Sequence, residues 1–97
     1  MPDFLLLMHN DTSSPEDSRL WERYLTGLRA AGALIGGSSI GNGAAVRRFA
    51  TPAPLSAHLT GFMRIRAADI EGAKRLVDGN PVLEAGGTVE IRELPED

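Results

Sequence analysis

The sequence predicts a single α+β domain over residues 1–97, because runs with the apolar pattern of strands are separated by two runs with the apolar spacing of helices. One strand-like run, FLLLM, is apolar throughout, and each helix-like run follows a capping residue. A content of 42% hydrophobic and 24% charged residues is ordinary for a soluble globular chain and excludes the disordered, collagen-like and membrane classes. At this length folding buries only about 60–65% of the surface of the unfolded chain, so a partner that covers more apolar surface would add stability.

The first predicted elements are a strand at residues 4–8 and a helix at residues 15–31. The run FLLLM is typical of a strand that is buried on both faces. Ser14 is a suitable N-cap, Pro15 suits the first helical position, and Gly32 suits the left-handed conformation that ends many helices. The helical spacing is carried by Leu20, Trp21, Tyr24, Leu25 and Leu28.

A hairpin is predicted next. Residues 33–40, ALIGGSSI, form a weak first arm, Gly-Asn-Gly at 41–43 is a strong turn signal, and AAVRRFA at 44–50 forms the second arm. Two prolines in TPAPLSA, at 51–57, break the sheet pattern, so this segment is expected to be a loop.

A third strand at residues 59–67, a second helix and a last strand at 88–94 complete the chain. Asp69 is expected to cap the helix, and Gly79 and Pro81 to end it. Because side chains alternate along a strand, the third strand has one face made by Gly61, Met63 and Ile65, and another made by Phe62, Arg64 and Arg66.

The order strand, helix, hairpin, strand, helix, strand predicts a ferredoxin-like split βαβ arrangement, with an antiparallel sheet and two helices on one of its faces. The other face is left open, and FLLLM at 4–8 offers it apolar side chains. We therefore predict a homodimer that joins its subunits through the open sheet face. The alternative is that a loop folds over this face, and only residues 41–57 are free to do so.

Composition excludes several kinds of site. Without cysteine there is no disulfide, thiolate nucleophile or sulfur-based zinc site, and two histidines are too few to predict a metal centre, so no cofactor is expected. A net charge of −3 argues against direct binding of nucleic acid. No run of 18 apolar residues is present, and FLLLM is too short for a signal peptide, so we expect a cytoplasmic protein that does not enter a membrane.

Several motifs together resemble the YCII-related family, in particular its DGPF branch. They are FLLLMHNDT, W-x-x-Y-x-x-x-L-x-x-A-G-x-L-x-G-G at 21–37, L-T-G-F at 59–62, A-x-D-I-x-x-A-x-x-L at 67–76, and NP followed by GGTVEIREL. The resemblance implies a dimeric α+β barrel. Where members of that branch carry an Asp-Gly-Pro-Phe motif, this chain reads ATPAPLSAH, so no catalytic residue of the family is carried over.

His9 and Arg66 form the first candidate site. We expect the first and third strands to lie adjacent and parallel, which would place both residues at the same end of the sheet. An arginine fork and a titratable histidine, with Asn10 and Asp11 close by, could bind an enolate or carboxylate and move a proton. Alternatively, His9 bonds to loop backbone and Arg66 pairs with a surface acid.

His58 and Arg64 are further candidates. His58 would enter the third strand at the end opposite to His9, so the two histidines would meet only across a dimer; otherwise His58 caps a loop. Arg64 shares a strand face with Phe62, where an unpaired buried charge would be costly. It must face solvent, meet an acid or line a polar cleft, and could hold an anionic ligand between subunits or form an interface salt bridge.

Two functions are compatible with these residues. The first is a non-catalytic binding or regulatory module that holds a small anionic or enolic ligand between subunits, through Arg64, Arg66 and His58, or docks on a protein partner. The alternative is a small lyase- or isomerase-type enzyme with His9 as general base and Arg64 or Arg66 as anion binder. The resemblance is compatible with both, since it includes a dehydrochlorinase and proteins linked with sigma factors, and the missing motif favours the binding module.

Overall fold

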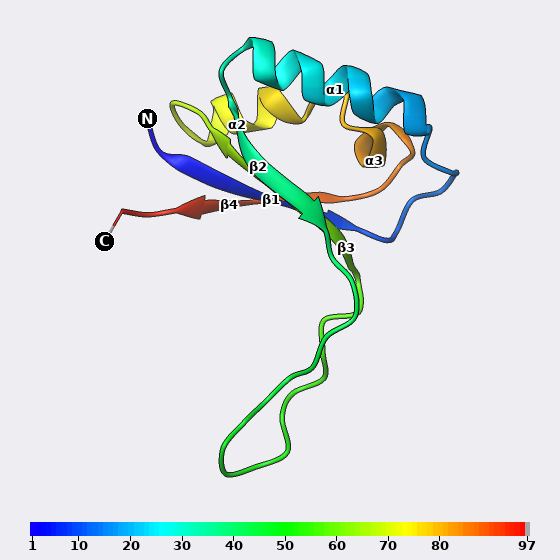
Figure 1. The fold of residues 1–97 in the computed structure, drawn as a ribbon, viewed down its shortest axis with the longest axis vertical. Coiled ribbons are helices and arrows are strands. Elements are labelled where there is room, and N and C mark those ends of the chain that lie inside the picture. Colours follow the sequence, from blue (N-terminus) through cyan, green and yellow to red (C-terminus); the bar gives the residue numbers. More distant parts are fainter. Residues whose placement is uncertain (97) are drawn as a thin grey trace.

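The computed structural model describes residues 1–96 and has an open sheet with helices on one side (Figure 1). The four-stranded sheet has the order β2-β3-β1-β4, and each neighbouring pair is antiparallel. This confirms the α+β class and the antiparallel sheet, and the strand order is compatible with a ferredoxin-like fold. The elements are β1 (Asp3–His9), α1 (Ser18–Ala30), β2 (Leu34–Ser39), β3 (Leu59–Arg66), α2 (Ile70–Val77), α3 (Pro81–Glu84) and β4 (Val89–Leu94).

Helix α1 begins three residues later than its sequence predicts. Asp17 is the N-cap, and its carboxylate accepts a hydrogen bond of 3.0 Å from the backbone nitrogen of Arg19. Ser14 does not cap the helix; its hydroxyl and its backbone nitrogen both donate to the carbonyl oxygen of Ala85. Gly32 follows the helix with a φ of 69°, as expected for a left-handed end.

The second helical region consists of two short helices. Asp69 caps α2 as predicted, accepting a hydrogen bond of 2.8 Å from the backbone nitrogen of Gly72. Pro81 does not only end this region; it is the first residue of α3, whose N-cap is the fully buried Asn80. Within residues 1–96, no helix combines the length and apolar character needed to cross a bilayer.

The predicted hairpin is wrong in its second arm. Residues 44–50 are not a strand, and β2 pairs directly with β3, from Leu34 opposite Ile65 to Ser39 opposite Gly61. Residues 40–58, which we call the arm, form a long connection that projects from the sheet (Figure 1). The alternating apolar residues of β3 pack on the core, whereas AAVRRFA has no such pattern with which to compete for the edge of β2.

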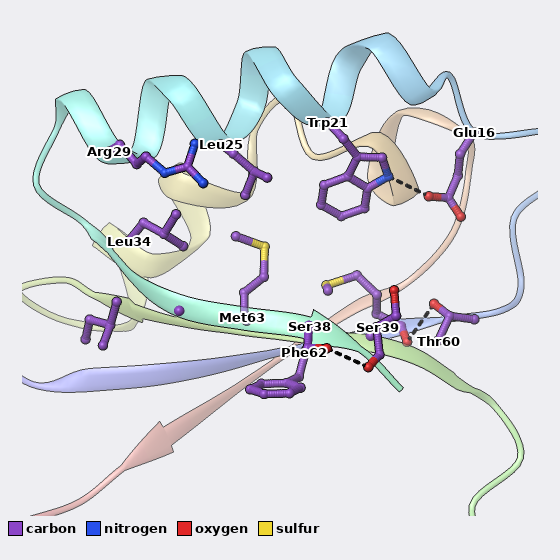
Figure 2. A pocket seen from close by; sticks show the side chains of 15 residues that line it. Glu16, Trp21, Leu25, Arg29, Leu34, Ser38, Ser39, Thr60, Phe62 and Met63 are labelled. Atoms are coloured by element: carbon purple, nitrogen blue, oxygen red, sulfur yellow. Dashed lines mark hydrogen bonds between the residues drawn. The ribbon is translucent and has the colours of Figure 1, made fainter. Parts of the chain in front are cut away.

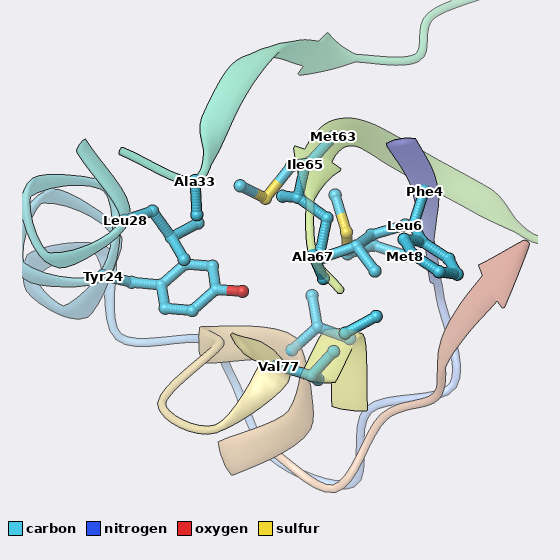
Figure 3. Packing of buried hydrophobic residues seen from close by; sticks show 12 residues of the cluster. Phe4, Leu6, Met8, Tyr24, Leu28, Ala33, Met63, Ile65, Ala67 and Val77 are labelled. Atoms are coloured by element: carbon cyan, nitrogen blue, oxygen red, sulfur yellow. The ribbon is translucent and has the colours of Figure 1, made fainter. Parts of the chain in front are cut away.

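The core lies between the sheet and the helices (Figure 3). Alternate residues of β1 point into it, so FLLLM is fully buried on one face and half-buried on the other, rather than buried on both as the sequence predicts. Helices α1 and α2 both contribute side chains to this core. The buried cluster includes Phe4, Leu6, Met8, Tyr24, Leu28, Met63, Ile65, Ala73 and Val77.

Candidate functional site

The face of the sheet opposite the helices, the open face, carries side chains from neighbouring strands that lie side by side. Asp3, Leu5, Leu7 and His9 point toward this open face and are half-buried, because the residues between them fill the core. Strand β4 places Glu90 and Arg92 on the same face, since they lie opposite Leu7 and Leu5 and alternate with the valine and isoleucine that pack against the core. The open face therefore combines apolar centres with charged neighbours.

The antiparallel register defines which side chains are neighbours. Leu5 lies between Arg64 of β3 and Arg92 of β4. In the next row, Leu7 has Phe62 beside it on β3. A leucine between two arginines is a surface that suits a ligand with an apolar body and a negative group.

An arginine pair shares one carboxylate at the end of the face where β1 begins. Arg64 reaches the Oδ2 atom of Asp3 at 2.7 Å and Arg66 reaches Oδ1 at 3.1 Å. The hydrogen bond from Arg64 is the main cause that lowers the pKa of Asp3, so this carboxyl stays ionised. Both arginine side chains remain about half exposed, at 50% and 52%. Two guanidinium groups facing one carboxylate leave an excess of positive charge here.

A histidine cluster occupies the other end. The Nε2 atom of His9 lies 3.0 Å from Oε1 of Glu90, and the ring of His58 meets the His9 ring edge-on, with a centroid distance of 4.8 Å. Because a carboxylate only accepts hydrogen bonds, Nε2 of His9 is the donor in this contact. The bond from His9 is the main cause that lowers the pKa of Glu90, which also accepts from Arg92 at 3.3 Å.

Two expectations about these ends are wrong. His9 and Arg66 do not share an end of the sheet, and His9 and His58 do not lie at opposite ends. The reason is strand direction: β1 and β3 are antiparallel, so Arg66 lies opposite Asp3 whereas the start of β3 lies opposite His9. The helix between β1 and β2 makes those two strands parallel, and β3 returns between them.

The two ends are too far apart to act together in one subunit. His9 lies six positions after Asp3, which corresponds to about 20 Å along a strand. Arg64, opposite Leu5, is about 13 Å from the His9 position by the same measure. A small ligand held by Arg64 and Arg66 therefore does not reach His9 of the same chain.

The loop groups beside His9 are engaged in holding the sheet together. Asp11 accepts hydrogen bonds from the backbone nitrogen of Thr88 at 2.7 Å and from its hydroxyl at 2.6 Å, and these bonds lower the pKa of Asp11. Asn10 donates to the carbonyl oxygen of Ala57 at 3.3 Å, at the base of the arm. Both side chains therefore have structural partners other than His9.

Sequence reasoning missed three partners. Asp3 and Arg92 were not candidates, and Glu90 is expected from sequence to be a solvated strand residue, yet it orients His9. Alternation alone places Asp3 and His9 on one face of β1, but the antiparallel direction is needed to join them to their partners. Among residues 1–96, no group of three or more histidine or acidic side chains has the arrangement of a metal site.

The chain matches no protein-family model, and no curated protein matches it either. Its class is thus defined by its fold, an α+β domain with an open antiparallel sheet of the order β2-β3-β1-β4. The resemblance to the YCII-related family stays a prediction that rests on the motifs quoted above.

Proposed function

We propose that this protein is a homodimeric binding module that joins its subunits through the open sheet face and holds a small anionic or enolic ligand in the cleft between them. The observation that carries the proposal is the arginine pair, in which Arg64 and Arg66 share the single carboxylate of Asp3. Their unused N–H groups can form charge-assisted hydrogen bonds with a carboxylate or enolate. Leu5 and Phe62, half-buried on the same face, favour a ligand with an apolar body.

The dimer is part of this proposal because the open face combines half-buried leucines with charged groups in an array that a second copy can cover. A face-to-face pair with its twofold axis running across the strands places the arginine end of one copy opposite the histidine end of the other. His58 of one copy then lies beside the arginine pair of its neighbour, which unites the three predicted ligand-binding residues Arg64, Arg66 and His58. We propose a cytoplasmic location for this dimer.

A thermal-shift screen with small carboxylates, phenols and enolic acids tests the binding function. A ligand present at ten times its Kd adds about 1.4 kcal/mol, which raises the melting temperature of a domain of this size by about 5–10 °C. Arg64→Ala should abolish that rise. Arg19→Ala is the matched control, because Arg19 also pairs with one aspartate, at 3.1 Å, but lies on α1 outside the open face. A rise that survives Arg64→Ala excludes the arginine pair as the site.

Dimer formation is tested separately by sedimentation equilibrium. The expected mass is about twice the 10.4 kDa of the chain. A monomer at all concentrations would contradict the shared cleft, even if a ligand binds.

The second candidate function is a lyase- or isomerase-type enzyme, and the His9–Glu90 pair favours it. Glu90 orients the ring and leaves Nδ1 of neutral His9 as the acceptor that a general base requires. Since Arg64 is about 13 Å from His9 along the strands, the anion binder has to come from the second copy.

Mixed dimers test this candidate for any substrate that the screen identifies. His9→Ala and Arg64→Ala should each abolish turnover while the protein stays folded. A mixture of the two variants should regain part of the activity, because one of the two sites then combines an intact histidine with an intact arginine. No recovery in mixed dimers would exclude a site shared between copies.

A further inference from the structure

A cavity of about 660 Å³ lies between α1 and the edge of the sheet formed by β2 (Figure 2). Its volume is in the range of sites that hold small molecules. The end of β2 has no large side chain on the helix side, because Gly37 and Ser39, which lie opposite Met63 and Gly61, are the residues of this end that face α1. At Gly37 the backbone approach is so close that a Cβ atom would lie 2.6 Å from the carbonyl oxygen of Phe62.

The walls of this cavity are mostly apolar. Trp21 and Leu25 of α1 point down toward the sheet, and Leu34 and Met63 point up toward the helix (Figure 2). Met8 lines the deeper side. Methionine side chains adapt to irregular shapes, and an indole face suits a flat ring or an alkyl chain.

Trp21 is held in place at the cavity wall. Its indole Nε1 donates a hydrogen bond of 2.9 Å to the carboxylate of Glu16 (Figure 2). This bond satisfies the polar atom of the indole and leaves the apolar ring toward the cavity. Glu16 keeps its negative charge at this end of the cavity, so the carboxylate of an anionic ligand is better accommodated at the opposite end of α1.

The arginine at the C-terminal end of α1 indicates which polar group the ligand carries. Arg29 lines the cavity at the last turn of α1 and, among residues 1–96, makes neither an ion pair nor a side-chain hydrogen bond. A guanidinium without an acid beside an apolar cavity is complementary to a single carboxylate attached to an apolar body. Ser39 and Thr60 add hydroxyl groups at the rim.

We propose that this cavity is a second binding site, for a small monocarboxylic acid with an apolar ring or short alkyl chain. The apolar body lies against Trp21, Leu25 and Met63, and the carboxylate binds Arg29. The site is separate from the arginine pair, because neither Arg64 nor Arg66 lines this cavity.

The fluorescence of Trp21, the single tryptophan of the chain, reports directly on the cavity. The probes are 3-phenylpropionate and its neutral analogue 3-phenylpropan-1-ol, titrated into the full chain. Saturable changes in emission are expected with the acid, and binding of the alcohol should be at least about tenfold weaker, because it lacks the charge-assisted bond. Arg29→Gln should weaken binding of the acid about tenfold and leave the alcohol unchanged.

Two further variants keep the test decisive. Arg23→Gln is the matched control, since Arg23 lies on the same helix but does not line this cavity. Leu25→Asn makes the apolar wall polar and should weaken both probes, measured by calorimetry if the fluorescence does not respond.

Three results would overturn the proposal. They are equal affinities for the acid and the alcohol, an equal effect of Arg23→Gln and Arg29→Gln, and calorimetry without binding of either probe. A change in Trp21 emission that depends on protein concentration alone and disappears in Phe49→Ala would show instead that the arm of a second copy fills the cavity. If neither probe binds the cavity but Arg64→Ala still abolishes the ligand-dependent rise in melting temperature, the cavity proposal fails and the open-face function stands.

Discussion

Substitutions at Asn80 provide the sharpest test of how the helical layer is held. Asn80 is 0% exposed, and its Oδ1 atom accepts a hydrogen bond of 2.9 Å from the backbone nitrogen of Val82, itself 1% exposed. Its Nδ2 atom has no hydrogen-bond partner. Burial raises the pKa of the neighbouring Tyr24 and Asn80 lowers it to a smaller extent, while the Tyr24 hydroxyl donates a hydrogen bond of 2.6 Å to the carbonyl oxygen of Leu76.

The two polar atoms of the Asn80 amide therefore differ: Oδ1 forms the cap and Nδ2 has no hydrogen-bond partner. Asn80→Ala removes the cap and leaves the buried nitrogen of Val82 without an acceptor, which should cost about 1–2 kcal/mol in the free energy of unfolding. Asn80→Ser keeps an acceptor and removes the unpaired donor, so it should be about 1 kcal/mol more stable than the alanine variant. Asn80→Asp keeps the shape and the acceptor but places a carboxyl group in a fully buried position.

The aspartate variant adds a pH dependence of known sign. Burial raises the pKa of such a carboxyl, so the folded state binds a proton more tightly than the unfolded state. Its stability should therefore be lowest near pH 7 and increase as the pH falls, until both states are protonated. Urea unfolding at pH 7 and pH 4.5, followed by tryptophan fluorescence, measures all three variants. Equal unfolding free energies for the alanine and serine variants, or an aspartate variant as stable as the parent at pH 7, would refute this account.

Three further predictions concern the strands and the arm. Gly37→Ala should destabilise the fold by about 1–3 kcal/mol in urea unfolding, because the new Cβ meets the Phe62 carbonyl at 2.6 Å, whereas Gly36→Ala, with nothing within 4 Å, should change it little; equal effects would contradict the close approach. Because the pKa of Glu90 is lowered from 4.5, this carboxylate stabilises the fold above that pH, and the contribution is lost as the pH falls further. Glu90→Gln should therefore flatten the acid side of a plot of melting temperature against pH, and an unchanged slope would exclude this pair as its cause. Replacing residues 41–56 of the arm with Asn-Gly keeps the contacts of Ala57 and His58 with Asn10 and His9, shortens the loop by about two doublings of length and should stabilise the fold by about 1 kcal/mol; a lower free energy of unfolding would contradict this.

The fold class could be predicted from the sequence because local signals agree with it. Alternation in residues 59–66, the cap at Asp69 and the left-handed glycine at 32 each act over a few residues, and each is found in the structure. The prediction of the second hairpin arm was wrong because the Gly-Asn-Gly turn signal at 41–43 is local, whereas packing on the core decides which strand pairs with β2.

The candidate site was less predictable for a different reason. Residue types singled out His9, His58, Arg64 and Arg66, but which of them meet depends on strand direction. Because β3 was predicted to run parallel to β1, His9 and His58 were placed at opposite ends of the sheet although they are in contact. The same error placed His9 beside Arg66, which lies at the far end. Glu90 had no local signal that distinguished it from a solvated strand residue, since its partner is 81 positions away.

The position of β1 in the sheet affects how the chain folds during synthesis. β1 is a central strand, and both of its neighbours, β3 and β4, lie in the C-terminal part of the chain. Translation proceeds at about 5–20 residues per second, so roughly 4–17 s pass between the synthesis of β1 and that of β4. Its first partner, β3, begins 50 positions after the end of β1, so for about 3–10 s of this interval the most apolar strand has no edge with which to pair. Until β3 has been made, FLLLM is an unpaired apolar segment of the nascent chain that can associate with other chains.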